Sequence, residues 1–306
     1  MNKFTPTLLI ALSLSAVPAQ ATATRTWVSG KGSDTNPCTL ASPCRTFAYA
    51  ISQTTPGGEI DVLDPAGYGA LTITQSISIV NDGVGTTGVQ AAAGATAITI
   101  NAGSTDVVYL RGLTVEGAGI AQYGIQFNSG ASLAVEKCFI RHFTKDGIWL
   151  NTSASSKFTV SDSIASDNGG NGISIMPLGG SLSSTISGVM TNHNTDGVHM
   201  DIYYSPATAV TTIVNSIAAN NSGTGFYVRA NPSYIGAMIL RNVTATGNSA
   251  GFWNTGYYRT VLLSRALFSG NLYGTLNRSY DSFMDNFIGA NNAPEPPGGN
   301  TYWGLR

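Results

Sequence analysis

The chain has 306 residues, of which 42% are hydrophobic and 10% are charged, and its formal net charge is -1. Nucleic-acid binding is disfavoured, because there is no basic stripe to displace counterions from phosphates. The 36 glycines and the low charge could suggest disorder, but the regular alternation of hydrophobic residues indicates a buried core.

The first 21 residues have the features of a secretory signal. Lys3 precedes an apolar run over 8–14, and small residues stand at Ala19 and Ala21, where a signal peptidase would cut. The run is too short to span a bilayer, and no later stretch offers about 18 consecutive apolar residues. We therefore expect a secreted or periplasmic protein with no membrane insertion of the mature chain.

The three cysteines fit an exported protein. Cys38 and Cys44 flank a short loop and are predicted to form a disulfide. Cys138 is left over, and it occupies a column of small residues described below. We interpret it as a buried filler rather than a reactive thiol.

A short amphipathic helix is predicted over 45–52, with Thr46 as its N-cap. It follows an opening strand at 26–29 and the loop that the disulfide closes. A stack of β coils has an open end with unpaired backbone groups, so a helix placed before the first coil would cap it.

From residue 58 to about 290, short alternating runs bounded by Gly, Asn, Asp and Pro predict an all-β region. The first strands are expected at 59–63, 71–73, 76–80, 97–100 and 107–110. Further along, a four-residue pattern recurs: a glycine, an apolar residue, an outward-facing residue and usually a second apolar residue. The copies start at Gly124, Gly147, Gly172, Gly197, Gly225, Gly251 and Gly274, at spacings of 23, 25, 25, 28, 26 and 23 residues.

A second column of small residues keeps a constant offset, nine residues before the next glycine. Its members are Cys138, Ser163, Gly188, Ser216 and Asn242, with Gly112 and Ala266 as looser members at either end. Two columns in register at this period are typical of a solenoid of stacked coils.

Each coil has room for three short strands and three turns in about 25 residues. In the coil that starts at Gly147, the side chains expected to point inward are Ile148, Leu150, Phe158, Val160 and Ile164. Asparagines precede the repeat glycines at Asn168, Asn194, Asn220, Asn221, Asn248 and Asn271. We expect them to suit left-handed turns and to stack in ladders.

These repeats resemble the right-handed parallel β-helix proteins, the superfamily of pectate lyases, polygalacturonases and phage tailspikes. The resemblance rests on Gly-Ile-Gln-Phe, Gly-Ile-Trp-Leu, Gly-Ile-Ser-Ile, Gly-Val-His-Met and Gly-Phe-Tyr-Val with their Asn-rich turns. The segment from Val28 to Phe47 also looks like the entry segment of exported bacterial β-helix repeat proteins, whose function is mostly unassigned. The resemblance and the right-handed crossover rule imply a right-handed, single-stranded parallel β-helix with an N-terminal capping helix.

We accordingly divide the chain into a signal peptide over 1–21, an N-terminal cap segment over 22–57, a parallel β-helix over 58–290 and a C-terminal capping tail over 291–306. The tail is rich in Pro and Gly and cannot continue a ladder. Tyr302 and Trp303 are expected to fold back over the last coil.

Six residues, each two positions after a repeat glycine, are expected to face solvent. They are Gln126, Trp149, Ser174, His199, Tyr227 and Trp253. Aromatic residues on such a face predict a platform for sugar rings along the rod, with Trp149, Tyr203, Tyr227 and Trp253 as substrate-binding residues. The alternative is cross-strand packing of these rings under covering loops.

An acid, a base and a cation are expected on the same face. Asp201 and Arg229 lie on adjacent coils beside His199, so they are candidate catalytic residues. The resemblance implies lyase chemistry, in which a cation neutralises a uronate carboxylate and a base removes the adjacent proton. The alternative is a surface ion pair beside a histidine.

Asp146 and Asp196 are a second candidate catalytic pair. They occupy equivalent turn positions two coils apart, about 10 Å at about 4.8 Å per coil. An inverting glycosidase needs about 6.5–9.5 Å between its carboxyl groups, so the spacing is marginal. Aspartate before a turn glycine is also a routine turn residue.

No cofactor is evident in the sequence. His142, His193 and His199 have no metal-binding spacing, so no zinc site is predicted, whereas calcium at Asp or Asn turns is compatible with the sequence. We predict an exported protein that binds a polysaccharide or cell-surface glycan along one face, with lyase or hydrolase activity left open. The alternative is a non-catalytic, adhesin-like structural protein.

Overall fold

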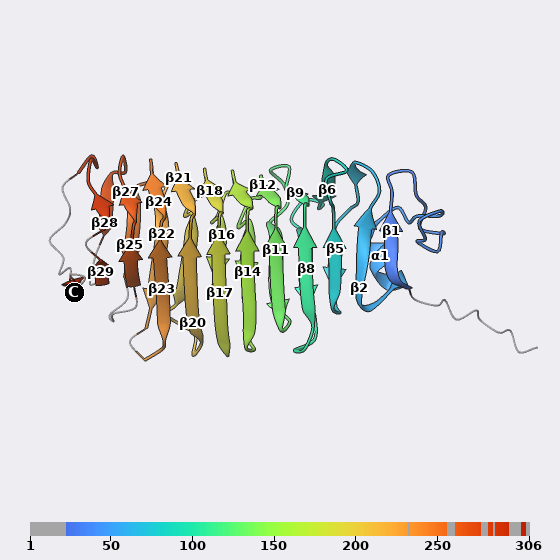
Figure 1. Ribbon diagram of the computed structural model, residues 1–306, viewed down its shortest axis with the longest axis horizontal. Helices are drawn as coiled ribbons and strands as arrows, with labels where there is room; N and C mark the ends of the chain where they lie inside the picture. Colours follow the sequence, from blue (N-terminus) through green and yellow to red (C-terminus); the bar gives the residue numbers. More distant parts are fainter. Residues whose placement is uncertain are drawn as a thin grey trace, which may run out of the picture.

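Three parallel β-sheets wrap around one apolar core in the computed structural model (Figure 1). The structure describes residues 23–231, 233–255, 261–276, 281–283, 285–293 and 301–303. The predicted signal peptide over 1–21 lies outside the described residues, as does most of the predicted tail. Neighbouring strands pair in parallel and in register, as Ile125 does with Ile148 and Ile148 with Ile173.

Sheet 1 carries the long strands. It consists of β1 (Ala23–Val28), β2 (Thr54–Val62), β5 (Ile77–Val80), β8 (Val107–Arg111), β11 (Ser132–Glu136), β14 (Ser156–Ser161), β17 (Ser181–Ser187), β20 (Thr208–Val214), β23 (Gly236–Arg241), β26 (Val261–Ser264), β29 (Asp281–Phe283) and β31 (Thr301–Trp303).

Sheet 2 contains the strands that follow the repeat glycines. It consists of β4 (Leu71–Ile73), β7 (Thr96–Asn101), β10 (Tyr123–Ser129), β13 (Ile148–Leu150), β16 (Ile173–Ile175), β19 (Val198–Ile202), β22 (Thr224–Ala230), β25 (Ala250–Asn254) and β28 (Tyr273–Leu276).

Sheet 3 has the shortest strands. It consists of β3 (Ala66–Gly67), β6 (Thr87–Gln90), β9 (Thr114–Glu116), β12 (Phe139–Arg141), β15 (Ile164–Ser166), β18 (Met190–Asn192), β21 (Ile217–Ala219), β24 (Thr244–Thr246), β27 (Leu267–Phe268) and β30 (Phe287–Ile288). The chain passes from sheet 1 to sheet 3 to sheet 2 in each coil, so the predicted three-strand coil is confirmed.

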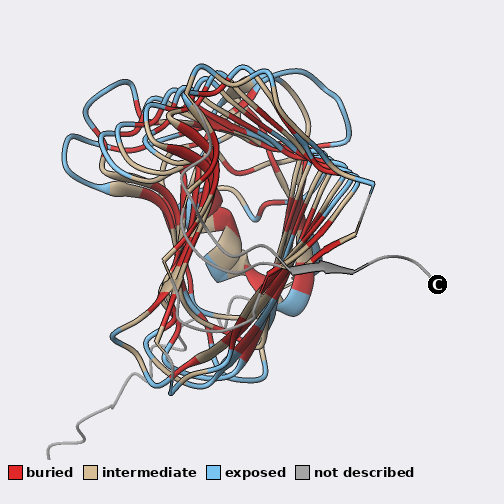
Figure 2. Ribbon diagram, turned by 90° about the vertical axis from the view of Figure 1, so that its left-hand side faces the viewer, coloured by how far each residue is buried: buried red, intermediate tan, exposed pale blue. Residues whose placement is uncertain are grey.

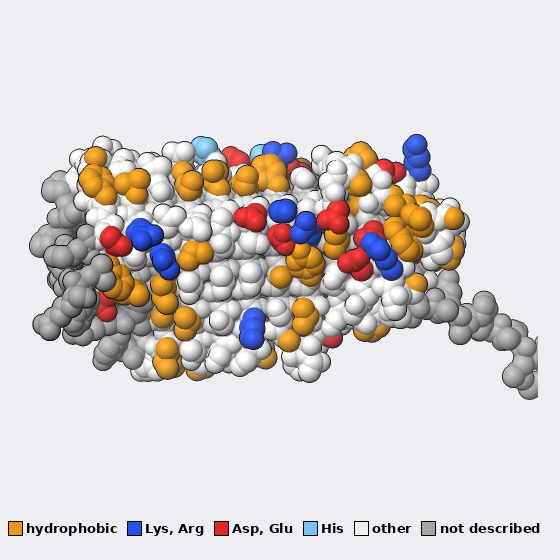
Figure 3. All heavy atoms as spheres, viewed as in Figure 1, with side chains coloured by type: hydrophobic (Ala, Val, Ile, Leu, Met, Phe, Trp, Pro, Cys, Tyr) orange, Lys and Arg blue, Asp and Glu red, His pale blue; other side chains and the backbone are white. Residues whose placement is uncertain are grey.

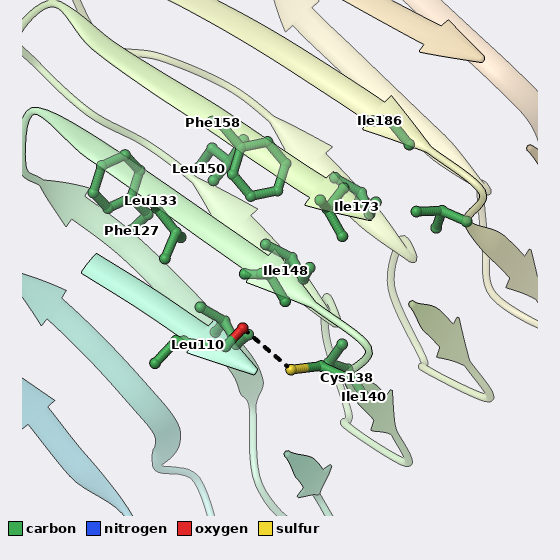
Figure 4. Packing of buried hydrophobic residues seen from close by; sticks show 14 of the residues in the cluster. Leu110, Phe127, Leu133, Cys138, Ile140, Ile148, Leu150, Phe158, Ile173 and Ile186 are labelled. Carbon is green, nitrogen blue, oxygen red and sulfur yellow. Dashed lines mark hydrogen bonds between the residues drawn. The ribbon is translucent and has the colours of Figure 1, made fainter. Parts of the chain in front are cut away.

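The core lies between the three sheets, where buried residues line the inner faces (Figure 2). Ile148, Leu150, Phe158 and Val160 are buried as predicted, and Figure 4 shows Ile148, Leu150 and Phe158 packed with the core side chains of neighbouring coils. The prediction for Ile164 is wrong, because its side chain is 37% exposed and Ala165 points inward instead.

The error at Ile164 arises at a two-residue turn between sheets 1 and 3. Asp162 there has a positive φ of 48°, which interrupts the inside-outside alternation. As a result, the apolar residue that begins the strand faces outward in several coils, as at Ile164, Met190 and Ile217. Figure 3 shows hydrophobic side chains in a row along these strands.

The predicted column of small residues is partly out of register. Strand pairing aligns Cys138, Ser163 and Ser216 with Val189 and Val243, whereas Gly188 and Asn242 occupy the preceding left-handed position. Cys138 is a buried free thiol, and burial raises its pKa to about 12. The interpretation of Cys138 as a buried filler is confirmed.

The repeat glycines are required by the close approach of successive coils. A Cβ on any of the five glycines from Gly147 to Gly251 would lie between 2.5 and 2.8 Å from the carbonyl oxygen of the next repeat glycine. A side chain at these positions would therefore separate the coils.

The predicted asparagine ladder is confirmed. Its rungs are Asn168, Asn194, Asn221, Asn248 and Asn271, and each side-chain Nδ2 donates to the Oδ1 of the next rung, with Asn291 as the last acceptor. The five rungs are buried. The predicted left-handed conformation is wrong for them: it occurs one residue earlier, at Asp167, His193, Asn220, Gly247 and Gly270.

The N-terminal end of the solenoid is closed by α1 (Phe47–Gln53), which lies across the space between the sheets (Figure 2). Thr46 is its N-cap, as predicted, and its Oγ1 accepts from the N–H of Tyr49. Cys38 and Cys44 form the predicted disulfide, with their Cα atoms 4.6 Å apart. Within the described ranges, no helix is long and apolar enough to span a membrane.

Candidate functional site

The outward column of sheet 2 is in register over six coils. Strand pairing places Gln126, Trp149, Ser174, His199, Tyr227 and Trp253 side by side in this order. The expectation that all six face solvent is wrong for Ser174, which is buried, while the other five are half-buried.

Ring contacts continue along this column on both sides of Ser174. Trp149 stacks on Tyr123 with ring centroids 4.7 Å apart, and Lys145 Nζ lies 5.2 Å from the centroid of Tyr123. On the other side Tyr227 meets Trp253 edge to face at 5.4 Å. The indole N–H groups of Trp149 and Trp253 are buried and have no hydrogen-bond partner among the residues that the structure describes.

His199 is held in position by Asp196. The His199 Nδ1 lies 2.7 Å from Asp196 Oδ2, and the imidazole stacks on Tyr227 with ring centroids 4.3 Å apart. Asp196 Oδ1 accepts from the N–H of Thr224 at 2.6 Å. A carboxylate at Nδ1 favours the tautomer with its proton there, which leaves Nε2 as a proton acceptor.

Asp201 and Arg229 form a separate ion pair on the same sheet. Arg229 Nε donates to Asp201 Oδ2 at 3.0 Å, and Arg229 Nη2 contacts the same oxygen. Asp201 raises the pKa of Arg229 above its ordinary value. The guanidinium also lies 5.4 Å from the ring centroid of Tyr203 and 5.1 Å from that of Tyr204. The expected pairing of Asp201 with Arg229 is confirmed, but His199 pairs with Asp196 instead.

A hydrogen-bonded chain joins Asp146 to Asp196. Asp146 Oδ1 accepts from the N–H of Asn171 at 2.7 Å, and Asn171 Oδ1 accepts from the N–H of Asp196 at 3.2 Å. Asn171 Nδ2 also donates to the Ser174 hydroxyl at 2.8 Å. Burial raises the pKa of the Asp146 carboxyl, and this effect outweighs the hydrogen bond from Asn171.

The raised pKa of Asp146 predicts a pH-dependent stability. The folded protein holds this proton more tightly than the unfolded chain, so the carboxyl favours folding below its unfolded pKa of about 3.9. That contribution is lost as the pH rises through the folded pKa. We expect Asp146→Asn, whose amide oxygen can still accept from Asn171, to reduce the fall in unfolding free energy between acid and neutral pH.

The measurement is urea denaturation of wild type and Asp146→Asn over a pH series. Asp162→Asn, at an exposed turn, is the matched control and should follow the wild-type profile. A profile for Asp146→Asn that coincides with wild type would contradict the assignment.

Sequence reasoning missed the link between two columns. In two repeats the residue before the glycine contacts the residue two after it: Asn171 contacts Ser174, and Asp196 contacts His199. Both columns were visible in the sequence, and their i, i+3 spacing was the available signal. Tyr123, in the column before the glycines, and Tyr204 were also missed.

Metal-binding residues do not cluster in the part of the chain that the structure describes: no three His, Cys, Asp or Glu side chains converge there. His142 pairs with Glu116 at 2.8 Å, and His193 lies 3.8 Å from Asp167, both at turns between sheets 3 and 2. Calcium at an Asp or Asn turn stays a prediction.

The family model described as "Right handed beta helix region" matches residues 96–271, which is more than half of the chain. The protein therefore belongs to the right-handed β-helix family, and the resemblance seen in the repeats is confirmed. No curated protein matches its sequence.

Solved structures with a similar fold include polysaccharide-processing enzymes. An alginate lyase from Paenibacillus sp. str. FPU-7 is 14% identical with a TM-score of 0.61, over 92% of this chain and 98% of that one. Pectate lyase Pel9A is 16% identical with a TM-score of 0.58, over 90% and 80%. The A-module of mannuronan C-5 epimerase AlgE4 from Azotobacter vinelandii is 17% identical with a TM-score of 0.54, over 84% and 81%. Identities this low show a shared fold and do not transfer an activity.

Proposed function

We propose that this protein is exported and binds an acidic polysaccharide along the outward column of sheet 2. The observation that carries the proposal is a set of ring contacts on either side of Ser174. Tyr123 contacts Trp149 on one side, and Tyr227 contacts His199 and Trp253 on the other. The half-buried rings of this column leave part of their apolar surface accessible to the CH face of sugars. Export is supported by the disulfide, which is typical of oxidising compartments.

Acidic sugars are favoured by the cations on this face. Lys145 lies over the ring of Tyr123, and Arg229 lies over Tyr203 and Tyr204. A uronate carboxylate could reach either cation while its ring rests on an aromatic side chain. Because Asp201 already neutralises Arg229, Lys145 is the stronger candidate for this contact.

A β-elimination is the reaction that the Asp196–His199 pair supports best. In this reaction His199 Nε2 would take the proton from the carbon next to the uronate carboxylate. The electron pair forms a carbon–carbon double bond, and the glycosidic oxygen leaves and takes a proton from solvent. Asp196 would stabilise the imidazolium that results.

Hydrolysis by Asp146 and Asp196 is less favoured. Asp196 already accepts hydrogen bonds from Thr224 and contacts His199, so its carboxylate is not free to activate a water molecule. Non-catalytic binding by an adhesin-like rod is the remaining candidate, since the side chains of Asp196 and His199 are only 13% and 17% exposed.

Removing either tryptophan should weaken polysaccharide binding about tenfold, the equivalent of about 1.4 kcal/mol. Trp149→Ala and Trp253→Ala would be compared with wild type by calorimetric titration against alginate and polygalacturonate. Trp27→Ala removes a half-buried tryptophan from sheet 1 and is the matched control. Equal affinities in all four proteins would refute binding on sheet 2.

Replacing His199 should abolish elimination while binding persists. We expect His199→Gln to lower the rate of formation of unsaturated uronate, read by absorbance, by about 100-fold or more. His142→Gln, a histidine outside sheet 2, should act as wild type. Undiminished product from His199→Gln would exclude it as the base, and binding without product in wild type would favour the adhesin-like rod.

A further inference from the structure

A straight groove runs along the turns that lead from sheet 3 to sheet 2. Its volume is about 700 Å³, and it extends from Asn168 and Gly169 to Asn292, across successive coils. We refer to it as the turn groove. It is separate from the outward column of sheet 2, whose aromatic residues do not line it.

The turn groove has the same cross-section in each coil. An exposed residue in the left-handed conformation forms one wall, an asparagine forms the floor, and the residue after the asparagine forms the other wall. His193, Asn194 and Thr195 show this pattern, and the triplet from Asn220 to Ser222 repeats it. Successive coils are about 4.8 Å apart, so the five steps from Asn168 to Asn292 span about 24 Å.

The floor of the turn groove is rigid because it coincides with the asparagine ladder. Asn194 and Asn221 use both their backbone N–H and their side-chain Nδ2 to bond the next rung. The walls are kept low by small residues, including Gly247 and Gly270 with φ of 68° and 69°. A ligand would therefore meet a preformed surface, which lowers the entropic cost of binding.

The lining of the turn groove is polar, and among its described residues His193 is the titratable side chain. It consists mainly of amides, hydroxyls and glycine backbone, and the described residues that line it include no Asp, Glu, Lys or Arg. Leu272, which is 44% exposed, adds an apolar contact. A second hollow of about 580 Å³ continues the same turn positions towards the N-terminus, at His142, Phe143 and Thr144, and its lining also includes the carboxylate of Asp167.

We propose that the turn groove binds a neutral polysaccharide chain, laid parallel to the solenoid axis. Exposed amides such as Asn220 and exposed hydroxyls such as Ser222 match the hydroxyl groups of such a chain, and Leu272 matches its CH face. An acidic chain would find no lysine or arginine among the described residues of the main groove to offset the loss of hydration of its carboxylates. The site is independent of the proposed function of sheet 2.

Selective chemical blocking tests this proposal. In Ser222→Cys a thiol stands on the groove wall, while the other free thiol, Cys138, is buried and Cys38 and Cys44 are joined. A bulky maleimide should therefore modify the new thiol alone. Thr185→Cys, on the exposed face of sheet 1, is the position control, and the unlabelled proteins are the controls for the substitution itself.

The probes are cello-oligosaccharides and manno-oligosaccharides of increasing length, titrated by calorimetry. We expect affinity to rise with chain length until the chain spans about 24 Å and then to level off. Labelled Ser222→Cys should lose at least tenfold in affinity, and labelled Thr185→Cys should lose nothing.

The proposal would be overturned if none of these oligosaccharides bound, or if labelled Ser222→Cys bound them as wild type does. It would also be overturned if Trp149→Ala, and not labelled Ser222→Cys, lost their binding. The last result would assign neutral chains to sheet 2. Alginate serves as the second ligand, because its binding should depend on Trp149 and not on the label at Ser222. The two sites can therefore fail separately.

Discussion

Gly197→Ala is expected to destabilise the solenoid severely. The new Cβ would lie 2.5 Å from the carbonyl oxygen of Gly225, 2.6 Å from Thr191 Oγ1 and 2.9 Å from the Cβ of Ala218. The first of these atoms is backbone of the next coil, so relief requires the coils to separate and parallel strand pairing to weaken. Overpacking of this kind costs about 1–3 kcal/mol and sometimes more, and we expect at least the upper value.

Guanidinium denaturation followed by circular dichroism measures this effect, with Gly67→Ala as the matched control. Gly67 lies in β3, and a Cβ there would have no heavy atom within 4 Å. Its replacement should leave the unfolding free energy unchanged within about 0.5 kcal/mol. Similar midpoints for Gly197→Ala and wild type would contradict the proposed role of the repeat glycines.

Asn221→Ala is expected to cost about 3 kcal/mol of unfolding free energy. The side chain is 1% exposed, accepts from the backbone N–H and Nδ2 of Asn194, and donates to the carbonyl oxygen of Thr191. Alanine would remove all three bonds and leave the buried N–H of Asn194 without its acceptor, and such an unsatisfied group costs about 1–3 kcal/mol.

The matched control is an asparagine that also bonds an asparagine on a neighbouring coil but lies on the outer face. Asn128 Nδ2 donates to Asn101 Oδ1 at 2.7 Å near the surface. Because water can replace this bond, Asn128→Ala should cost no more than about 0.5 kcal/mol. An equal loss of unfolding free energy in Asn221→Ala and Asn128→Ala would show that burial does not strengthen the contribution of the ladder to stability.

The fold was predictable because the two periods in this sequence have simple physical causes. A period of two buries Ile148 and Leu150, and the repeat near 25 residues follows from coil closure and the close approach of glycines. The inward position on sheet 3 was not predictable in the same way. The left-handed residue Asp162 interrupts the alternation, and aspartate is common in turns of several kinds.

The candidate site was predictable as columns of residues but not as pairs of interacting side chains. Pairing of Asp201 with Arg229 follows from their adjacent coils. Pairing of Asp196 with His199 depends on the path of the chain around Gly197, which determines where the side chains on either side of the glycine point. The position of Ser174 along the strand predicts that its side chain points outward. It does not show how far larger neighbouring side chains cover it.

Sheet 2 and the turn groove differ in the chemistry that they present to a ligand. Sheet 2 and its flanking turns carry stacked rings, the Asp196–His199 pair and two cations, whereas the described lining of the turn groove has no Lys, Arg, Asp or Glu. Both follow the solenoid axis, because each coil repeats the same positions in register. A rod of this kind could hold two different chains side by side.

The most direct test of polysaccharide binding on sheet 2 is a crystal structure of the protein with an acidic oligosaccharide, such as an oligomannuronate. We predict a chain parallel to the solenoid axis over sheet 2, with sugar rings against Trp149 and Tyr227 and a carboxylate near Lys145. An acidic oligosaccharide bound elsewhere on the solenoid, with the outward column of sheet 2 unoccupied, would contradict it.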